Sequence, residues 1–277
     1  MTDSESILLS DLNDGVLTLT LNRPKVNAFN AALTQALQKA LRQAAGNPQV
    51  RCVMLAERGP ALSAGQDLFE IQQAQGTSFR EHLQRTYNPL ILQLRQIEKP
   101  VVAAIHGPVS GAALGIALAC DLRIAAGSAR FVVGFLGIGL APDSAVSLLL
   151  PALIGLGRAT EFAFSNLPIS AEQALAWGMV NRVVPAAELE SQARVYAQAL
   201  SLGPAGAFGL AKRAFNRAVL PNLEELVRLD ATAADATDSN SPGASSSAAT
   251  RGRSSSTSRR RSRRAARRTP TVSGLQI

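Results

Sequence analysis

A single carboxylate, Asp143, stands in an otherwise apolar stretch of the chain, residues 135–155. Burial in apolar surroundings raises the pKa of a carboxyl group, which makes it a better general base near neutral pH. The alternative interpretation is structural. Asp143 follows Pro142 and precedes an apolar run that predicts a helix, and acidic residues are favoured in the first turn of a helix.

Two segments rich in Gly, Ala and Ser occur at residues 61–65 and 110–113. Backbone N–H groups in such turns are accessible, because no large side chain blocks the approach of a ligand. Two N–H groups that converge on one point stabilise a negative oxygen, and a helix that starts there adds the positive end of its dipole. Small residues also occur where backbones pack closely without any catalytic role, so this pattern alone leaves both interpretations open.

The elements that must position these residues alternate between strand and helix. Apolar periodicity predicts strands over residues 15–22, 50–56 and 100–107 and a helix over residues 30–46, with Asn30 as its N-cap. Residues 79–97 predict a helix that Pro89 interrupts. Helical patterns dominate after residue 155, and Ser170 and Gln173 have the spacing of a capping box. This order predicts an α/β core with a helical extension.

The composition indicates a globular protein. Of the 277 residues 47% are hydrophobic, and no run of 18 apolar residues predicts a membrane span. The acidic N-terminus does not resemble a signal peptide. Cys52 and Cys120 lie in apolar segments, so we expect buried free thiols and a cytoplasmic protein. Two His and two Cys far apart in the sequence give no pattern for a metal site.

The basic charge of the chain belongs to its C-terminal end. Residues 1–229 carry 19 Lys and Arg against 17 Asp and Glu, whereas residues 230–277 carry nine Arg against three Asp. Low-complexity composition predicts a disordered tail over residues 232–277. One explanation is a frameshift near residues 231–240, because a G/C-rich gene read out of frame yields these residue types. The other is a nucleic-acid-binding segment of low specificity, since it has arginines but no aromatic residues.

Four motifs, in order and in register, resemble the enoyl-CoA hydratase/isomerase (crotonase) family. They are LNRPKVNAF (21–29), ALSAGQDL (61–68), AAIHGPVSGAALGIALACDLRIA (103–125) and GIGLAPDSAVSLLLPALIGLGRATEFAF (137–164). The resemblance covers residues 7–229. It implies a spiral of β-β-α turns over residues 1–200, a helical extension over residues 201–231, and assembly as a homotrimer or hexamer. It also implies an enzyme that binds an acyl-CoA thioester and stabilises an enolate, with no cofactor apart from the CoA of its substrate.

The resemblance assigns roles to individual residues. The N–H groups of Ser63 and Ala112 are expected to form the oxyanion hole. Asp67 has the spacing of a helix cap. The resemblance also places its backbone beside the CoA. The CoA is expected to lie along residues that match the family's binding loops, namely Val26, Ala28, Ala61, Ser63, Ala64, Gly65, Asp67, Gly111 and Ala112.

Acidic residues separate the activities found in this family. Its hydratases use two glutamates, and the alignment places Gly115 and Phe135 at those positions. Asp143 resembles the acid that faces the acyl chain in the branch of 2-(1,2-epoxy-1,2-dihydrophenyl)acetyl-CoA isomerase, which usually has Gly where Ala145 stands. The sequence therefore predicts an acyl-CoA isomerase that shifts a double bond or a ring epoxide with Asp143 as the base. The alternatives are a 2-enoyl-CoA hydratase and a non-catalytic protein that binds CoA or RNA.

Overall fold

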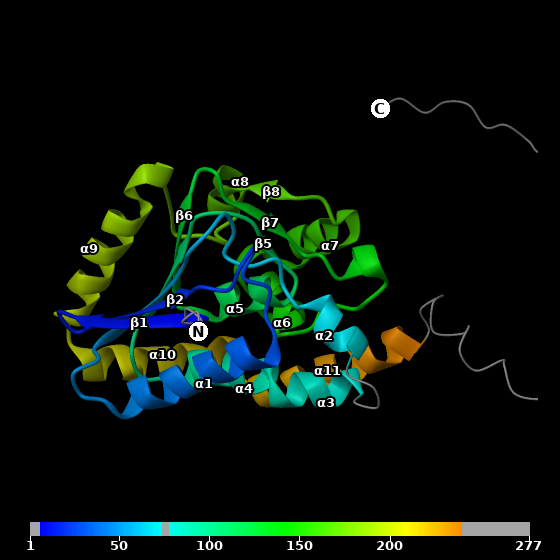
Figure 1. Cartoon of the computed structure of the whole chain (residues 1–277), viewed down its shortest axis with the longest axis horizontal. Helices are drawn as coiled ribbons and strands as arrows, with labels where there is room; N and C mark the ends of the chain where they lie inside the picture. Colours follow the sequence, from blue (N-terminus) through cyan, green and yellow to red (C-terminus); the bar gives the residue numbers. More distant parts are fainter. Residues whose placement is uncertain (1–5, 74–77, 240–277) are drawn as a thin grey trace, which may run out of the picture.

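The computed structural model describes residues 6–73 and 78–239, and it shows two β-sheets with helices packed around them (Figure 1). The larger sheet has the strand order β1-β2-β3-β4-β6-β9; the β1–β2 pair is antiparallel and the other pairs are parallel. The smaller sheet has the order β5-β7-β8. The strands are β1 Leu8–Asn13, β2 Val16–Leu21, β3 Cys52–Glu57, β4 Val101–Ile105, β5 Val109–Ser110, β6 Leu122–Ala126, β7 Arg130–Val132, β8 Ile169–Ser170 and β9 Arg182–Val184.

The helices fill the connections between strands and continue to the end of the described chain. The α-helices are α1 Ala31–Gly46, α2 Leu68–Gln73, α3 Phe79–Arg85, α4 Tyr87–Gln96, α5 Ala112–Ala119, α6 Val146–Ile154, α7 Leu156–Ser165, α8 Ala171–Ala176, α9 Leu189–Ser201, α10 Ala205–Val219 and α11 Leu223–Ser239. Two short 3-10 helices are η1 Leu136–Ile138 and η2 Ala186–Glu188.

Alternate residues of the central strands face two different helix layers. Cys52 and Met54 of β3 belong to a buried cluster with Ala193 of α9, whereas Val53 and Leu55 belong to the larger core that includes α1 and α4. In Figure 1, α9 lies on one side of the large sheet, and α1, α4 and α10 lie on the other. A parallel sheet covered on both faces needs apolar residues at successive positions, which explains the continuous apolar runs in the sequence.

Local signals in the sequence are confirmed at helix starts. Asn30 Oδ1 accepts a hydrogen bond from Leu33 N at 2.9 Å, and Ser170 Oγ accepts one from Gln173 N at 3.2 Å. The helix predicted over residues 79–97 is divided at Thr86 into α3 and α4. Pro89 falls in the first turn of α4, where its missing N–H would have no partner within the helix.

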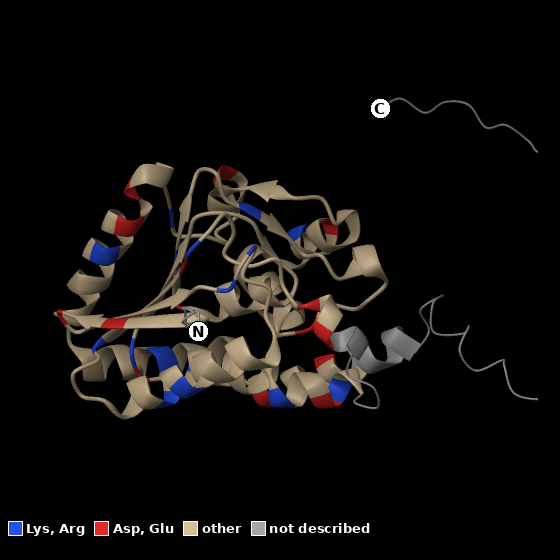
Figure 2. Cartoon of the chain, viewed as in Figure 1, with Lys and Arg blue, Asp and Glu red and all other residues tan. Residues whose placement is uncertain are grey.

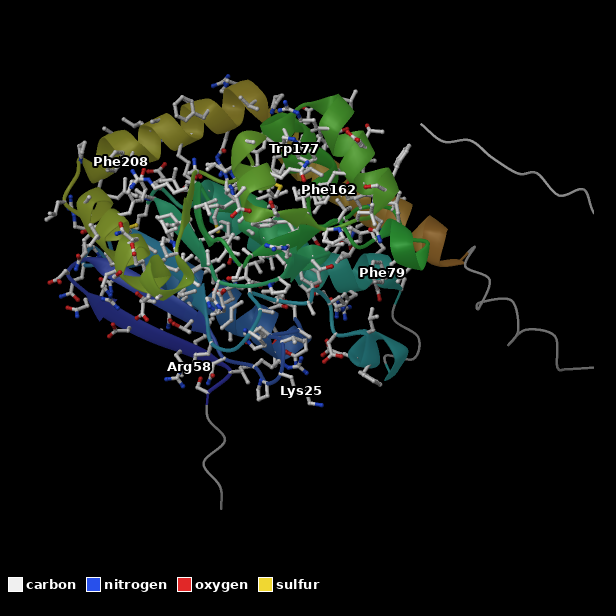
Figure 3. The ribbon with its side chains drawn as sticks, turned by 90° about the horizontal axis from the view of Figure 1, so that it is seen from above. Lys25, Arg58, Phe79, Phe162, Trp177 and Phe208 are labelled. Atoms are coloured by element: carbon white, nitrogen blue, oxygen red, sulfur yellow. The ribbon has the colours of Figure 1, made fainter. Side chains whose placement is uncertain are left out.

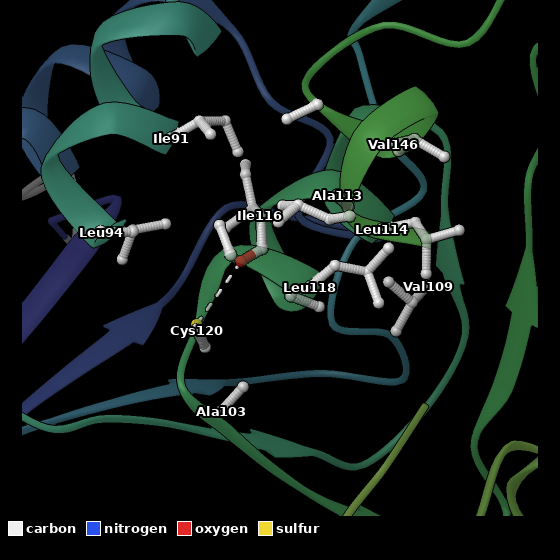
Figure 4. Close-up of a cluster of buried hydrophobic side chains, with 14 of the residues drawn as sticks. Ile91, Leu94, Ala103, Val109, Ala113, Leu114, Ile116, Leu118, Cys120 and Val146 are labelled. Atoms are coloured by element: carbon white, nitrogen blue, oxygen red, sulfur yellow. Dashed lines mark hydrogen bonds between the residues drawn. The ribbon is translucent and has the colours of Figure 1, made fainter. Parts of the chain in front are cut away.

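Helix α5 is buried along its whole length and forms the centre of the larger core (Figure 4). Cys120, at its C-terminal end, is a buried free thiol like Cys52, as predicted, and its Sγ donates to the Ile116 carbonyl at 3.4 Å. The guanidinium of Arg123, which is 4% exposed, donates to the carbonyls of Cys120 and Met179, each at 2.6 Å. These contacts fix the position of α5 and therefore of its N-terminus.

Acidic and basic side chains are interspersed over the described part of the chain (Figure 2). None of the helices among the described residues combines the length and the apolar character that crossing a membrane requires. Helix α11 continues to Ser239, past the predicted start of the tail at residue 232. The predictions for the rest of the tail fall on residues 240–277, which lie outside the described residues.

Candidate active site

A cavity of about 400 Å³ lies between the start of α5, helices α3 and α4, and the turn that precedes α6. Most of its lining is apolar, and α3 supplies Phe79, which is labelled in Figure 3. The lining residues are Ala64, Gly65, Gln66, Leu68, Phe79, Leu83, Tyr87, Ser110, Gly111, Ala112, Gly134, Phe135, Ile138, Leu140 and Asp143. A second hollow of about 420 Å³ beside α10 contains Asp121, but Lys212 and Arg95 pair with this carboxylate at 2.8 and 3.1 Å.

Asp143 is the carboxylate of the first cavity, and it is 1% exposed. Burial raises its pKa from 3.8 to about 7; a hydrogen bond from Ser144 Oγ at 2.6 Å opposes this shift, and the charge of Asp230 adds to it. Asp143 is not the cap of α6, because the N-cap position is Ala145 and no side chain of the turn caps the helix. The structural alternative, a place for Asp143 in the first turn of the helix, is therefore not found, and the chemical role of Asp143 stays a prediction.

The turn after Asp143 has an unusual backbone. Ser144 and Ala145 both have left-handed conformations, with φ of +52° and +62°. Residues other than Gly rarely adopt such angles, and where they do the strain is frequently associated with a functional site. The usual Gly of the related branch would suit the position of Ala145 for the same reason.

The two positions at which hydratases carry glutamates cannot provide an acid here. Gly115 lies in α5, and a Cβ atom added to it would be 2.1 Å from the Ser144 carbonyl oxygen. Any side chain at this position would thus collide with the turn that carries Asp143. Phe135 lines the cavity with a buried aromatic ring. Among the described lining residues, Asp143 is therefore the single carboxylate.

Ala112 begins α5, and its N–H group donates to no other residue in the described part of the chain. The loop that contains Gly65 packs against this point. A Cβ added to Gly65 would be 2.8 Å from the Ser110 carbonyl oxygen and 3.7 Å from Ala112 N, and Gly65 has a φ of +95°. Gly is needed here both for its backbone conformation and for this close approach.

The expected second donor, Ser63 N–H, is directed away from the cavity, which corrects the prediction. Ser63 forms a parallel bridge with Val109, and its carbonyl accepts from Ser110 N at 3.2 Å. In an extended chain the N–H and C=O of one residue point to the same neighbouring strand, so the Ser63 N–H also faces the β5 segment. Ala64 N–H is likewise engaged, with the Val26 carbonyl at 3.1 Å.

Gln66 provides the N–H group that sequence reasoning missed. Gln66 forms a parallel bridge with Phe29, in which both hydrogen bonds come from its neighbours in the chain. Phe29 N donates to the Gly65 carbonyl at 2.7 Å, and Asp67 N donates to the Phe29 carbonyl at 2.8 Å. The N–H and C=O of Gln66 itself therefore point away from Phe29. The Gln66 N–H has no acceptor among the described residues, and Gln66 lines the cavity. No pattern in the sequence reveals this direction, because it depends on the register of the bridge.

The side chain of Gln66 is held by two aromatic residues. Tyr87 Oη donates to Gln66 Oε1, and His82 Nε2 lies 3.0 Å from the same oxygen. Tyr87 is buried, and its pKa is raised mainly by this burial and further by the negative charge of Asp143. Its hydroxyl therefore remains protonated at neutral pH and is a donor at the cavity wall.

The residues expected to hold CoA form two joined loops. Arg23 donates to the Ala28 carbonyl at 2.7 Å and pairs with Asp67 at 2.6 Å, so it ties residues 23–28 to the loop after β3. Burial alone would raise the pKa of Asp67, but Arg23 outweighs it and lowers the pKa. Asp67 also accepts from Phe69 N at 3.0 Å, as predicted for a cap of α2.

The remaining residues of these loops differ in exposure. Val26 is 38% exposed and Ala64 is also exposed, whereas Ala61 is buried. Lys25 and Arg58, labelled in Figure 3, project at the same edge of the molecule. Of the residues predicted to bind CoA, Ala64, Gly65, Gly111 and Ala112 line the cavity itself. Val26 is joined to this lining, because its carbonyl accepts from Ala64 N at 3.1 Å.

This fold is that of the crotonase class, which includes solved enoyl-CoA hydratases. The chain belongs to the enoyl-CoA hydratase/isomerase family, whose profile matches residues 11–248. The predicted family and the predicted crotonase-like α/β fold are thereby confirmed.

Individual relatives cover most of the chain. It is 37% identical over 227 residues to 1,2-epoxyphenylacetyl-CoA isomerase of Escherichia coli (strain K12), covering 80% of this chain and 87% of the relative. It is 35% identical over 215 residues to 4-chlorobenzoyl coenzyme A dehalogenase-2 of Arthrobacter sp, covering 76% and 78%. A crystal structure of an enoyl-CoA hydratase from Mycobacterium avium subsp. paratuberculosis K-10 matches with a TM-score of 0.77 at 32% identity, covering 86% and 92%.

Proposed function

We propose that this protein is an acyl-CoA isomerase that uses Asp143 as its single acid–base group. The observation that carries the proposal is a carboxylate 1% exposed, with a pKa of about 7, on the wall of an apolar cavity that also contains a helix N-terminus. Asp143 removes a proton from the carbon next to the thioester carbonyl and returns it at the γ carbon. The double bond moves, and the enzyme ends the cycle in its initial protonation state.

A pKa near the working pH suits a group that must both accept and donate a proton. A group with a much lower pKa would be too weak a base, and one with a much higher pKa would not return the proton. Isomerisation requires one such group, whereas hydration in this family uses two. The absence of an acid at Gly115 and Phe135 therefore supports isomerisation over 2-enoyl-CoA hydration.

The N–H groups of Ala112 and Gln66 stabilise the enolate oxygen in this proposal. Neither donates to another described residue, so each can donate to the thioester oxygen without first breaking a bond in the protein. Donors fixed before the reaction are effective because they need no reorganisation, and one such donor lowers the barrier by about 3–4 kcal/mol. The dipole of α5 adds positive potential at Ala112, and Arg123 stabilises the opposite end of this helix.

The CoA portion lies, in the same proposal, along Val26, Ala28, Ala61, Ala64, Gly65, Asp67 and Gly111, with Lys25 near its phosphates. Two of the relatives are named for CoA thioesters whose acyl groups carry a six-membered ring, epoxyphenylacetyl and chlorobenzoyl. The rings of Phe79 and Phe135 give the cavity of this chain a surface suited to an acyl group with such a ring. Assembly as a trimer or hexamer and a cytoplasmic location remain predictions.

Mass spectrometry of a substrate panel tests this function. The purified protein is incubated with 2-enoyl-, 3-enoyl- and ring-epoxide-CoA thioesters, and the mixtures are separated by liquid chromatography before mass detection. We expect products of unchanged mass that elute at a different time from the substrate. A net gain of one water would instead indicate a hydratase. Asp143→Asn should lower kcat by about 10²–10⁴-fold, as expected for loss of a general base, while Asp11→Asn, at an exposed position of β1, should not change it.

A second variant tests the oxyanion donors. Ala112→Pro removes one N–H group at the first residue of α5, where proline is compatible with a helix. We expect kcat to fall by about 10²–10³-fold. Unchanged turnover in Ala112→Pro would contradict the assignment of this N–H group.

A further inference from the structure

The helix that follows Asp143 begins without a cap from its own turn. Val146 N–H donates to the Asp143 carbonyl at 2.9 Å, but the N-cap position is Ala145, whose side chain has no acceptor. The first N–H groups of a helix have no partners within it and need acceptors from elsewhere. An acceptor from a distant part of the chain can therefore complete the start of α6.

Asp230 of α11 is that acceptor. Ser147 Oγ lies 2.6 and 2.8 Å from the two carboxylate oxygens of Asp230 and donates its single proton to this carboxylate. The backbone of Ala145 also faces the carboxylate and lowers its pKa. A negative charge at the N-terminus of a helix is also stabilised by the helix dipole. Asp230 thus holds the first turn of α6 through Ser147.

We propose that Asp230 is a positioning residue for the reaction, which clamps the Ser144–Ala145 turn from α11 and keeps Asp143 directed into the cavity. The proposal rests on the proposed role of Asp143 as the base. Two successive left-handed residues persist where the surrounding structure holds them in place. The hydrogen bond from Ser147 to Asp230, beside the Ala145 backbone, is the contact that does so, and it joins the turn to a helix more than 80 residues further along the chain.

Asp230 also acts on Asp143 through its charge. Burial is the main cause of the raised pKa of Asp143, and the negative charge of Asp230 raises it further. Among the residues that the structure describes, Tyr87 of α4 also faces Asp143, and Glu70 and Asp67 face Tyr87 in turn. Burial raises the pKa of Asp230 itself to about 6, although its bonds with Ser147 and Ala145 oppose this. Removing the charge of Asp230 should therefore lower the pKa of Asp143.

Kinetics of two Asp230 variants in the full-length protein test this proposal. Asp230→Ala removes the clamp, and we expect kcat to fall by about 10²-fold, as for a catalytic group displaced by about 1 Å. KM should stay within about 3-fold, because the lost contact does not touch the substrate. Asp230→Asn keeps the size of the side chain, so kcat should fall less, but the acidic limb of the kcat–pH profile should move to lower pH.

Two further variants separate positioning from general stability. Ser147→Ala removes the hydroxyl that donates to Asp230 but keeps the carboxylate, so kcat should fall and the acidic limb should move less than in Asp230→Asn. Glu225→Gln removes an exposed acid from the same helix and should change neither quantity. If Asp230→Ala does not fold, as judged by circular dichroism, Asp230→Asn and Ser147→Ala still carry the test.

The outcomes distinguish this proposal from the proposed function. The positioning role is overturned, and the proposed function left intact, if Asp143→Asn is inactive while both Asp230 variants keep the wild-type kcat and the wild-type acidic limb. Full activity of Asp143→Asn would overturn both. A fall in kcat for Asp230→Ala and a shifted acidic limb for Asp230→Asn would support the clamp.

Discussion

Substitution of Gly115 by Ala should damage both stability and activity, although Ala is the better helix former. The added Cβ would lie 2.1 Å from the Ser144 carbonyl oxygen, whereas ordinary contacts begin near 3.4 Å, so about 1.3 Å must be absorbed by movement. The neighbour is backbone and cannot rotate away, and the same turn carries Asp143. The strain therefore falls directly on the proposed base.

The size of the effect follows from two opposing contributions. Overpacking of a core lowers the free energy of unfolding by about 1–3 kcal/mol. Replacing Gly by Ala within a helix raises it by at most about 1 kcal/mol. We expect a loss of about 1–2 kcal/mol in the free energy of unfolding. Displacement of a catalytic group by about 1 Å can cost about 10²-fold in rate, so kcat should fall by about that factor.

Urea denaturation and turnover of a 3-enoyl-CoA substrate measure the two effects. The matched control is Gly157→Ala in α7, where a Cβ would meet nothing within 4 Å. This control should leave kcat unchanged and keep or slightly raise stability. If Gly115→Ala has the same unfolding midpoint and the same kcat as the wild type, the inferred contact between α5 and the Asp143 turn is wrong.

Three other predictions concern buried groups. Burial raises the pKa of Asp143 from 3.8 to about 7, so the stability contributed by its protonated form is complete below pH ~4 and is lost as the pH rises through 7. The loss amounts to at most about 1.4 kcal/mol per pH unit. In urea titrations the stability advantage of Asp143→Asn over the wild type should grow across this range, and a constant difference would contradict the prediction. Burial raises the pKa of the Cys52 and Cys120 thiols to about 12; mass spectrometry should find neither alkylated by iodoacetamide at pH 8 in the folded protein, and both alkylated in urea. Arg123→Met should lower the free energy of unfolding by about 1–3 kcal/mol, because it leaves buried carbonyls without donors; Arg217→Met, at an exposed position, is the control.

The sequence predicted the elements that carry the site better than it predicted the site itself. The signals at Asn30 and Ser170 are local, since an N-cap side chain and the N–H group that donates to it lie within a few residues, and both are confirmed. Strand β1 was missed because four of its six residues are exposed and it has no alternating apolar pattern. Pro89 predicted that the helix would be divided. The break lies at Thr86, three residues before Pro89, and this position depends on packing.

Long-range geometry explains what the sequence could not reveal about the site. Asp143 was recognisable because an acid in an apolar run is conspicuous. Gln66 was not, since the direction of its N–H group is set by pairing with Phe29, more than 30 residues away. Asp230 lies on an amphipathic helix, where an acid is ordinarily solvated, and its contact with the start of α6 exists only in the folded chain.

The close contact between Gly115 and the Ser144 carbonyl also limits how this enzyme could change its chemistry during evolution. In this chain, a side chain at position 115 and the turn that carries Asp143 compete for the same space. A glutamate introduced at position 115 has no room unless the turn moves first, so a single substitution does not place a second carboxylate on α5.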